Sequence, residues 1–247
     1  MLTRPRNWNA DSYQRVSAPQ ERMGRDVLDR LVLSGDERVL DAGCGTGRVT
    51  AALLERLPRG EVVGVDGSPA MVERARAALP PEVELQVADL LELELDRPVD
   101  AILSTATFHW IADHDRLFAR LRAALVAGGR LVAQCGGDGN IAPVLAAIER
   151  VGHPGLAGWP GPWRFASPRE TEAKLRDRGF TDVWCWPQTV RVVPDDLFEY
   201  LGTVVLGSHL ERLDAADRKP FVEAVGAELA DDGIDYVRLN MLARRAP

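Results

Sequence analysis

Short apolar runs and amphipathic segments alternate along the first 135 residues. The apolar runs have the length and the β-branched content of buried strands and lie at 39–41, 62–65, 83–87, 99–103 and 130–135. The segments between them carry apolar side chains at the three- and four-residue spacing of helices, near 21–33, 49–57, 69–79 and 114–125. Strands that alternate with helices form parallel sheets through right-handed crossovers. The pattern therefore predicts an α/β fold with a doubly wound sheet.

The pattern changes after residue 135. Glycine and proline are frequent from 136 to 161, around a short apolar helix at 144–151, which is typical of a lid. Ser167 and Glu170 form a capping box that starts another helix, and Gly179 ends it. Two more strands are predicted at about 181–193 and 236–242, and a helical insertion separates them.

The densest chemical signal is the glycine-rich loop after the first strand, Asp41-Ala42-Gly43-Cys44-Gly45-Thr46-Gly47. Glycine at alternate positions allows a tight turn and removes the Cβ atoms that would keep a ligand from the amides of the next helix. A dinucleotide fingerprint needs a further glycine where Arg48 stands. The Asp41 carboxylate would also repel a diphosphate at close range. The loop therefore favours a cationic or zwitterionic ligand.

Two further aspartates follow the next two strands. Asp66 ends the second strand, and Asp89 follows the third. Doubly wound folds place an acid after the second strand, where it binds ribose hydroxyls. Because the ends of parallel strands share one edge of a sheet, we expect Asp41, Asp66 and Asp89 to converge there.

This set resembles the class I S-adenosylmethionine-dependent methyltransferases. The resemblance implies S-adenosyl-L-methionine as the cofactor, with Asp66 on the ribose and Asp89 on the adenine amino group. It also implies a Rossmann-like sheet of seven strands, mostly parallel, with an antiparallel pair at its C-terminal edge. The residues that we expect to bind the cofactor are Tyr13, Asp41, Gly43, Cys44, Gly45, Asp66, Gly67, Met71, Ala88, Asp89, Leu90 and Ser104.

The whole chain is expected to form one methyltransferase domain, 1–247. Within it, residues 21–135 form the cofactor-binding core, and the aromatic, amide-rich segment 1–20 forms an N-terminal lid. Residues 136–166 and 194–230 are cap insertions, and insertions of this kind commonly cover the substrate in the family that the chain resembles.

The loop after the fourth strand, 104–111, faces the methyl group in class I methyltransferases, so His109 and Trp110 are the candidates on the acceptor side. Methyl transfer depends on alignment of the acceptor atom with the methyl carbon, and proximity terms reach about 7–11 kcal/mol. An alcohol or phenol also needs a base, whereas a carboxylate is already ionised at neutral pH. His109 is either that base or an ordinary histidine. The four histidines lack the spacing of metal ligands, and no metal is expected.

Three segments narrow the resemblance. The segment 8–20, the His109-Trp110 loop and the strand at 236–240 are similar to the trans-aconitate methyltransferase and juvenile hormone acid methyltransferase group. In the juvenile hormone acid branch, a glutamine at the position of Gln20 and a tryptophan matching Trp110 hold the substrate carboxylate. The chain departs from the trans-aconitate branch at 18–20, where that branch has an acidic-arginine pattern. The resemblance therefore implies methyl-ester formation on a small, largely apolar carboxylic acid, with Gln20, His109 and Trp110 as the catalytic positions.

Two alternatives stay open. The first is O-, N- or C-methylation of another small metabolite, with His109 as the general base. The second is a non-catalytic module that only binds S-adenosylmethionine. The aromatic stretch with Trp159, Trp163 and Phe165 is expected to pack locally. If it lined the pocket instead, the substrate would be mainly apolar, because a polyanion demands several convergent arginines.

Charge and cysteine content limit the partners. A net charge of −7, a pI of about 5.2 and the lack of a basic stripe make nucleic acid an improbable partner. The three cysteines are odd in number and widely spaced, and the first residues carry no apolar signal segment, so we expect a cytoplasmic protein. No run is long enough to cross a bilayer. We expect a monomer or a weak homodimer that acts on a small molecule.

Overall fold

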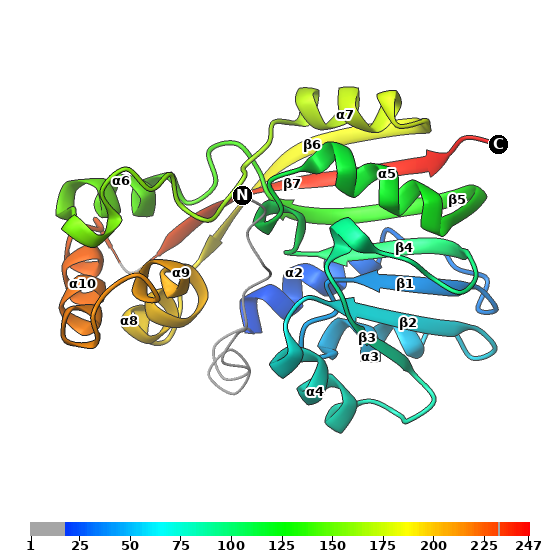
Figure 1. The fold of residues 1–247 in the computed structure, drawn as a ribbon, viewed down its shortest axis with the longest axis horizontal. Coiled ribbons are helices and arrows are strands. Elements are labelled where there is room, and N and C mark those ends of the chain that lie inside the picture. The colour runs from blue at the N-terminus through cyan, green and yellow to red at the C-terminus, as the bar shows by residue number, and fades with distance from the viewer. Residues whose placement is uncertain (1–17, 232) are drawn as a thin grey trace.

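A single seven-stranded sheet organises the computed structural model, which describes residues 18–231 and 233–247. The strands are β1 (Arg38–Ala42), β2 (Glu61–Asp66), β3 (Glu84–Val87), β4 (Val99–Thr105), β5 (Leu125–Gly136), β6 (Phe180–Val192) and β7 (Ile234–Arg245). Their order is β3-β2-β1-β4-β5-β7-β6 (Figure 1). β1 to β5 pair in parallel, whereas β7 is antiparallel to both β5 and β6. The mostly parallel sheet with an antiparallel pair at its C-terminal edge is confirmed.

Helices cover both faces of the sheet because successive strand residues point to opposite sides. Val39 and Val62 belong to one buried cluster, and their neighbours Leu40 and Val63 belong to another. Side chains of α2 (Ala18–Leu28), α3 (Arg48–Leu54) and α4 (Pro69–Ala78) complete the first cluster. Side chains of α5 (His114–Ala124) and α7 (Pro168–Asp177) complete the second. The predicted doubly wound architecture follows from this alternation.

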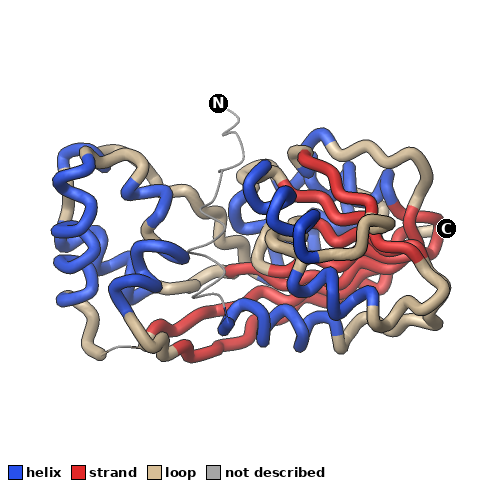
Figure 2. The backbone as a smooth tube through the Cα atoms, turned by 90° about the horizontal axis from the view of Figure 1, so that it is seen from below, coloured by secondary structure: helices blue, strands red, loops and turns tan. Residues whose placement is uncertain are grey.

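A third buried cluster lies beyond the sheet and defines a unit that we call the cap. Its helices are α6 (Ala142–Val151), α8 (Leu197–Tyr200), η4 (Leu201–Val205), α9 (Gly207–Leu210) and α10 (Ala215–Ala227). Figures 1 and 2 show these helices gathered at one end of the molecule, where the long strands β6 and β7 reach them. Val192 of β6 and Ile234 of β7 are buried in the same cluster. The cap therefore packs directly on the extended ends of these two strands.

Local sequence signals account for the starts of three helices, α4, α5 and α7. The Ser68 hydroxyl accepts the backbone N–H of Met71 at 3.4 Å, and the Ser167 hydroxyl accepts that of Glu170 at 3.2 Å, as N-caps do. α5 is capped by the Asp113 side chain, so His114 is its first residue. The predicted helix at 21–33 is observed at 18–28, and the predicted fifth strand begins at 125 instead of 130. A bulge between Val99 and Ala101 of β4 accommodates this longer β5.

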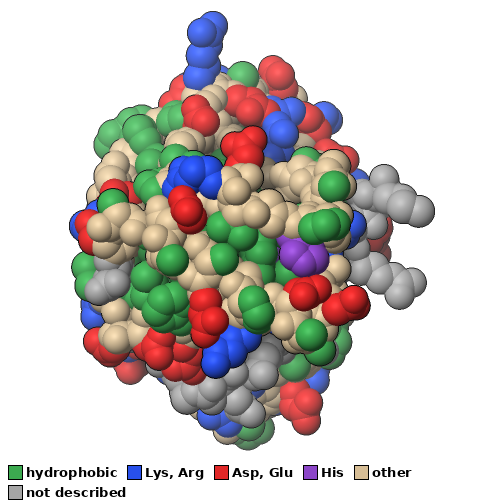
Figure 3. All heavy atoms as spheres, turned by 90° about the vertical axis from the view of Figure 1, so that its left-hand side faces the viewer, with side chains coloured by type: hydrophobic (Ala, Val, Ile, Leu, Met, Phe, Trp, Pro, Cys, Tyr) green, Lys and Arg blue, Asp and Glu red, His purple; other side chains and the backbone are tan. Residues whose placement is uncertain are grey.

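The surface mixes charges of both signs. In the view onto the cap end, acidic and basic side chains are interspersed among hydrophobic ones (Figure 3). Within 18–231 and 233–247, no helix combines the length and the apolar character that a membrane crossing requires. The expected N-terminal lid lies outside the described residues, apart from its last three.

Candidate active site

A cavity of about 1300 Å³ opens at the carboxyl edge of the parallel strands, between the sheet and the cap. It exceeds the roughly 300–1,000 Å³ of a typical single-ligand pocket. One wall consists of the loops after β1, β2, β3 and β4, and the opposite wall consists of cap residues and the stretch 159–165. The cavity therefore has room for a cofactor and a second small molecule.

The glycine loop is shaped by two different requirements. Gly43 has φ 91°, and a Cβ atom there would lie 2.0 Å from the Thr107 hydroxyl oxygen, so no larger residue fits. Gly45 has φ 54°, but its missing Cβ would meet nothing within 4 Å. Gly45 lines the cavity, so its bare backbone faces the space where a ligand binds.

Asp66 fastens the glycine loop to the end of β2. Its Oδ2 accepts the N–H of Gly45 at 2.9 Å, and its Oδ1 accepts the N–H of Ser68 at 2.8 Å. Burial raises the pKa of this carboxyl above its usual value, although both backbone hydrogen bonds oppose the shift. A carboxylate has about four lone-pair sites, so Asp66 keeps capacity for ligand hydroxyls. It lines the cavity, in agreement with its expected place.

Asp41, Cys44 and Ser104 do not line the cavity, although all three were expected among the binding residues. Asp41 is buried behind the loop, where its Oδ2 accepts the Thr50 hydroxyl at 2.7 Å. Burial raises the Asp41 pKa to about 6, with a further contribution from the charge of Asp66 and opposition from Thr50. Cys44 is buried against Gly64 of β2, and the Ser104 hydroxyl donates to a backbone carbonyl of β1 at 2.6 Å. These three side chains support the loop from behind.

The wall after β2 and β3 contains the other expected positions. Asp89 lines the cavity, and its Oδ1 accepts the N–H of Leu91 at 2.9 Å, which caps the short helix η1 (Leu90–Glu92). Four further expected residues line the same wall: Gly67, Met71, Ala88 and Leu90. Tyr13 lies outside the described residues.

A strained turn brings the acceptor-side residues to the cavity. Ala106, directly after β4, has φ 55°, which is unusual for a residue with a Cβ. The chain then forms η2 (Phe108–Trp110), and both His109 and Trp110 line the cavity. The turn therefore places these two predicted side chains at the cavity, a short distance along the chain from Thr107, which contacts Gly43 of the glycine loop.

His109 is held in one protonation state. Its Nδ1 accepts the backbone N–H of Gly136 at 3.2 Å, so Nδ1 carries no proton. Burial lowers the pKa of the ring well below its usual value, and the charges of Arg238 and His114 lower it further. The ring is therefore neutral, with its proton on Nε2.

Gln20 joins the cavity to the cap. It stands in the first turn of α2 and lines the cavity, and its side-chain amide is hydrogen-bonded to the Tyr200 hydroxyl of α8. The Tyr200 and Tyr236 hydroxyl oxygens are 2.8 Å apart. Residues from three distant segments thus meet at this point.

The aromatic stretch was expected to pack locally, but it also forms a cavity wall. Trp159, Trp163 and Phe165 all line the cavity. Trp163 stacks on Phe165 with a centroid distance of 5.7 Å, and the Trp110 ring lies 5.9 Å from Trp163. The rings pack on one another and still present an apolar surface to the cavity.

Arginines are the main site residues that the sequence analysis missed. Arg238 of β7 is 3% exposed yet lines the cavity, and its Nε donates to the Gln134 side chain at 3.3 Å. Arg164 and Arg212 also line it; Arg164 is paired with Glu170, and Arg212 lies 4.6 Å from the Trp159 ring centroid. A charged residue inside an apolar strand was the available signal for Arg238. In the described part of the chain, no group of side chains has the makeup of a metal site.

Comparisons with known proteins agree with this geometry. Residues 39–129 match the methyltransferase domain family. The chain is 33% identical over 226 residues to a trans-aconitate 2-methyltransferase from Azoarcus sp. (strain BH72), covering 86% of this chain and 85% of that protein. A trans-aconitate 2-methyltransferase from Methylobacterium nodulans is 31% identical over 256 residues, covering 97% and 98%.

Solved structures share the fold at low sequence identity. The YcgJ protein from Bacillus subtilis aligns with a TM-score of 0.65 at 19% identity, over 91% of this chain and 98% of that one. Phosphoethanolamine N-methyltransferase 2 from Haemonchus contortus, solved with S-adenosylhomocysteine, aligns with a TM-score of 0.64 at 19% identity, over 96% and 57%.

The protein is an S-adenosylmethionine-dependent methyltransferase, and S-adenosylmethionine is its cofactor. The cavity fits that group, because Gly45 leaves open space beside the loop amides and the buried acids Asp41 and Asp66 favour a cationic sulfonium. Within this class, the chain belongs to the trans-aconitate 2-methyltransferase family.

Proposed function

We propose that this enzyme methylates the carboxylate of a small organic acid and produces a methyl ester. The observation that carries the proposal is the state of His109. Its Nδ1 is occupied by the Gly136 N–H, and its Nε2 bears the proton. The nitrogen that remains for a ligand is a donor, so the ring is unsuited to remove a proton from an alcohol or phenol. An acceptor that is already ionised needs no base.

Hydrogen-bond donors and a cation surround the proposed acceptor position. Arg238 supplies a buried positive charge, and the Gln20 amide and the Trp110 indole can supply N–H groups. Charge-assisted hydrogen bonds from such groups hold a carboxylate in a fixed orientation. In this proposal, alignment of the carboxylate oxygen with the methyl carbon and exclusion of water supply most of the rate enhancement.

We propose the cofactor contacts from the loops after β1, β2 and β3. Asp66 would accept the ribose hydroxyls and Asp89 the adenine amino group. The backbone of Gly43, Gly45 and Gly67 and the side chains of Met71, Ala88 and Leu90 would enclose the rest.

The body of the substrate is proposed to be largely apolar. Trp159, Trp163 and Phe165 line the remaining wall. Arg164 of this wall is already paired with Glu170, which weakens its attraction for further carboxylates. Trans-aconitate, the compound in the relatives' names, carries several carboxylates. Its rate of methylation is therefore the one to compare with that of an apolar monocarboxylic acid.

The test is turnover with a panel of acceptors, each supplied with S-adenosylmethionine. The panel holds apolar monocarboxylic acids, trans-aconitate, phenols and amines. We expect a methyl ester, detected by mass and by its lability to mild base, and a rate that is nearly flat from about pH 6 to 8 because the acid is ionised throughout. Methylation of phenols or amines alone would refute the proposal.

Substitutions at His109 distinguish a role as hydrogen-bond donor from a role as general base. Glutamine offers an N–H in place of Nε2–H but is no base, so His109→Gln should keep much of the turnover. His109→Ala, the matched control, should lose about tenfold through the missing donor. Inactivity of both variants, with cofactor binding intact, would establish the general-base alternative instead.

A further inference from the structure

The Gln20 amide, which lines the cavity, has a hydrogen-bond partner for only one of its two polar atoms. Its Nε2 faces the Tyr200 hydroxyl, and its Oε1 is buried with no hydrogen-bond partner among the described residues. Rotation of the amide by 180° exchanges the two atoms. Oε1 then accepts the Tyr200 O–H, and the NH₂ group takes the buried position.

The two orientations suit opposite ligands. With Oε1 in the buried position, the amide can be satisfied only by a ligand that donates. With the NH₂ group there, it can be satisfied only by a ligand that accepts, such as a carboxylate oxygen. A buried polar group without a partner loses its hydration free energy, so the bound ligand decides which orientation is stable.

The two tyrosine hydroxyls complete the second orientation. The Tyr200 and Tyr236 oxygens are 2.8 Å apart, and either hydroxyl can donate. When Tyr200 donates to Gln20, Tyr236 can donate to Tyr200. The two hydrogen bonds then run in the same sense, from Tyr236 through Tyr200 to Gln20, and each bond polarises the other. The Arg238 guanidinium lies 5.8 Å from the Tyr236 ring and favours an anion at the same end.

We propose that Tyr236, Tyr200 and Gln20 form a positioning chain that holds the Gln20 NH₂ group toward the acceptor and so selects a carboxylate over a neutral donor. The inference rests on the proposed function. Tyr200 comes from α8 and Tyr236 from β7, whereas Gln20 comes from α2, so the chain also couples carboxylate recognition to the docking of the cap.

Three substitutions at Gln20 test the orientation. Gln20→Met keeps the length and removes both polar atoms, and we expect kcat/KM to fall about ten- to a hundredfold. Gln20→Glu still accepts from Tyr200 but directs an oxygen at the acid, so it should fall further than Gln20→Met. Cofactor affinity should stay unchanged in both. Activity of Gln20→Glu equal to or above that of Gln20→Met would overturn the proposed orientation.

A double-mutant cycle tests whether Tyr200 acts through Gln20. Tyr200→Phe should lower kcat/KM about fivefold in the native background but less than twofold in the Gln20→Met background. Val225→Ala, in the same buried cap cluster, controls for a loosened cap: its Tm should fall while kcat/KM stays near that of the native enzyme. Equal effects of Tyr200→Phe in both backgrounds would leave Tyr200 a structural role only. An acceptor panel without ester would refute the proposed function itself, before any variant is compared.

Discussion

The two ends of β1 each have a buried acid, and the pKa values of these two acids are shifted in opposite directions. Glu37, just before the strand, accepts backbone N–H groups of Ser34 at 2.8 Å and Gly35 at 2.9 Å and pairs with Arg130 at 3.0 Å. Burial alone would raise its pKa, but these bonds outweigh it and lower the Glu37 pKa to about 2. Asp41, near the other end, has one hydroxyl partner and a pKa raised to about 6.

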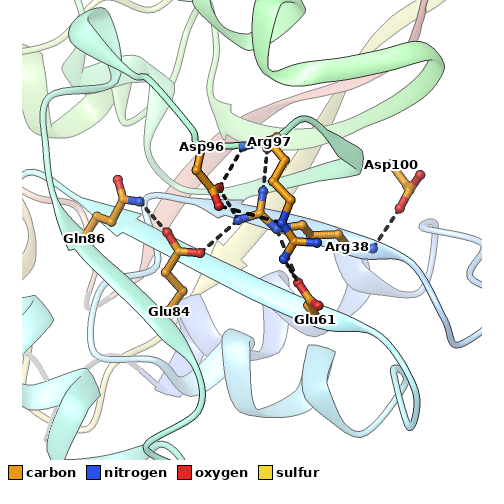
Figure 4. A network of polar contacts seen from close by, with 7 residues as sticks. All are labelled: Arg38, Glu61, Glu84, Gln86, Asp96, Arg97 and Asp100. Atoms are coloured by element: carbon orange, nitrogen blue, oxygen red, sulfur yellow. Dashed lines mark hydrogen bonds and ion pairs between the residues drawn. The ribbon is translucent and has the colours of Figure 1, made fainter.

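The same contrast extends along the two edges of the sheet. At the amino edge, Arg38 of β1 is nearly buried, and its Nη2 lies 2.9 Å from both Glu84 and Asp96 (Figure 4). Arg97 and Asp100 join this network (Figure 4). At the carboxyl edge, Asp66 and Asp89 line the cavity and Asp41 lies behind it, and within residues 18–231 and 233–247 no ion pair joins these three acids to an arginine. The acids of the amino edge are thus paired with arginines of the same edge. The acids of the carboxyl edge keep negative charge that can attract a cationic ligand, and their uncompensated burial lowers the stability of the fold.

The largest expected effect is the loss of cofactor affinity at the carboxyl edge. Asp66→Ala removes the two charge-assisted bonds that we propose to ribose and the hydrogen bond from the Gly45 N–H, so S-adenosylmethionine affinity should fall about a hundredfold, or on the order of 3 kcal/mol. Calorimetric titration measures this. Asp100→Ala is the matched control, since its carboxylate accepts the N–H of Arg38 at 2.8 Å at the opposite edge. Asp100→Ala should lower Tm and leave the affinity for S-adenosylmethionine unchanged. If both variants lost the same affinity, the proposed difference between the two edges of the sheet would be wrong.

The second prediction concerns the pH dependence of stability. The folded-state pKa of Asp41, about 6, lies above the ordinary aspartate pKa of 3.8, so Asp41 destabilises the fold increasingly as pH rises through this window. Asp41→Asn should raise the free energy of unfolding at pH 7 by on the order of 2–3 kcal/mol and have little effect near pH 4.

Glu37 should behave in the opposite sense. Its folded-state pKa lies below the usual 4.5, so its contribution is complete above that pH and is lost as pH falls toward about 2. Glu37→Gln should lower the free energy of unfolding at pH 7 by about 1–3 kcal/mol. Urea titrations between pH 4 and 7 measure both variants. Changes of the same sign at pH 7 would contradict the comparison.

The third prediction tests the amino-edge network. Arg38→Met should lower the free energy of unfolding by about 2 kcal/mol, or Tm by roughly 4–8 °C, because it leaves several carboxylates without their shared cation. Turnover at 25 °C should not change. Arg97→Met removes a more exposed member of the same network and should cost less than about 1 kcal/mol. A drop in turnover for Arg38→Met would link this edge to function.

The smallest expected effect is a difference in cofactor binding between alanine variants of two glycines that have similar backbone conformations. Gly45 and Gly128 both have positive φ, 54° and 72°, and at both a Cβ would meet nothing within 4 Å. Alanine at either site should cost about 1 kcal/mol of stability through the left-handed backbone. Thermal shifts with and without S-adenosylmethionine should show weaker binding for Gly45→Ala alone. Unchanged binding would mean that the cofactor does not approach Gly45.

The sequence predicted the features that depend on local order. Strand alternation determined the two-faced sheet, and the ends of parallel strands brought Asp66 and Asp89 to one cavity, because both follow from periodicity and handedness. His109 and Trp110 line the same cavity for the same reason, and their catalytic roles stay predictions.

Features that depend on distant packing were missed. The meeting of Gln20 with Tyr200 joins residues 180 positions apart, and the cap position that allows it has no local signal. Arg238 was missed because it stands in an apolar strand, and the spacing of residues along the chain did not show that this strand pairs with β5, next to the cavity. Asp41 was expected in the cavity, but the backbone turn at Gly43 leaves its side chain behind the loop.

The position of β7 determines when the active site can form during synthesis. β7 is the last strand of the sheet in chain order, yet it lies between β5 and β6, and among the described residues β6 pairs with the sheet through β7 alone. Until residues 234–245 leave the ribosome, β5 and β6 therefore both keep an unpaired edge, which is a hazard for aggregation. Arg238 and Tyr236 arrive with the same strand. A nascent chain can thus assemble β1 to β4 and their loops first, but completes the acceptor side of the cavity only in the final step of folding.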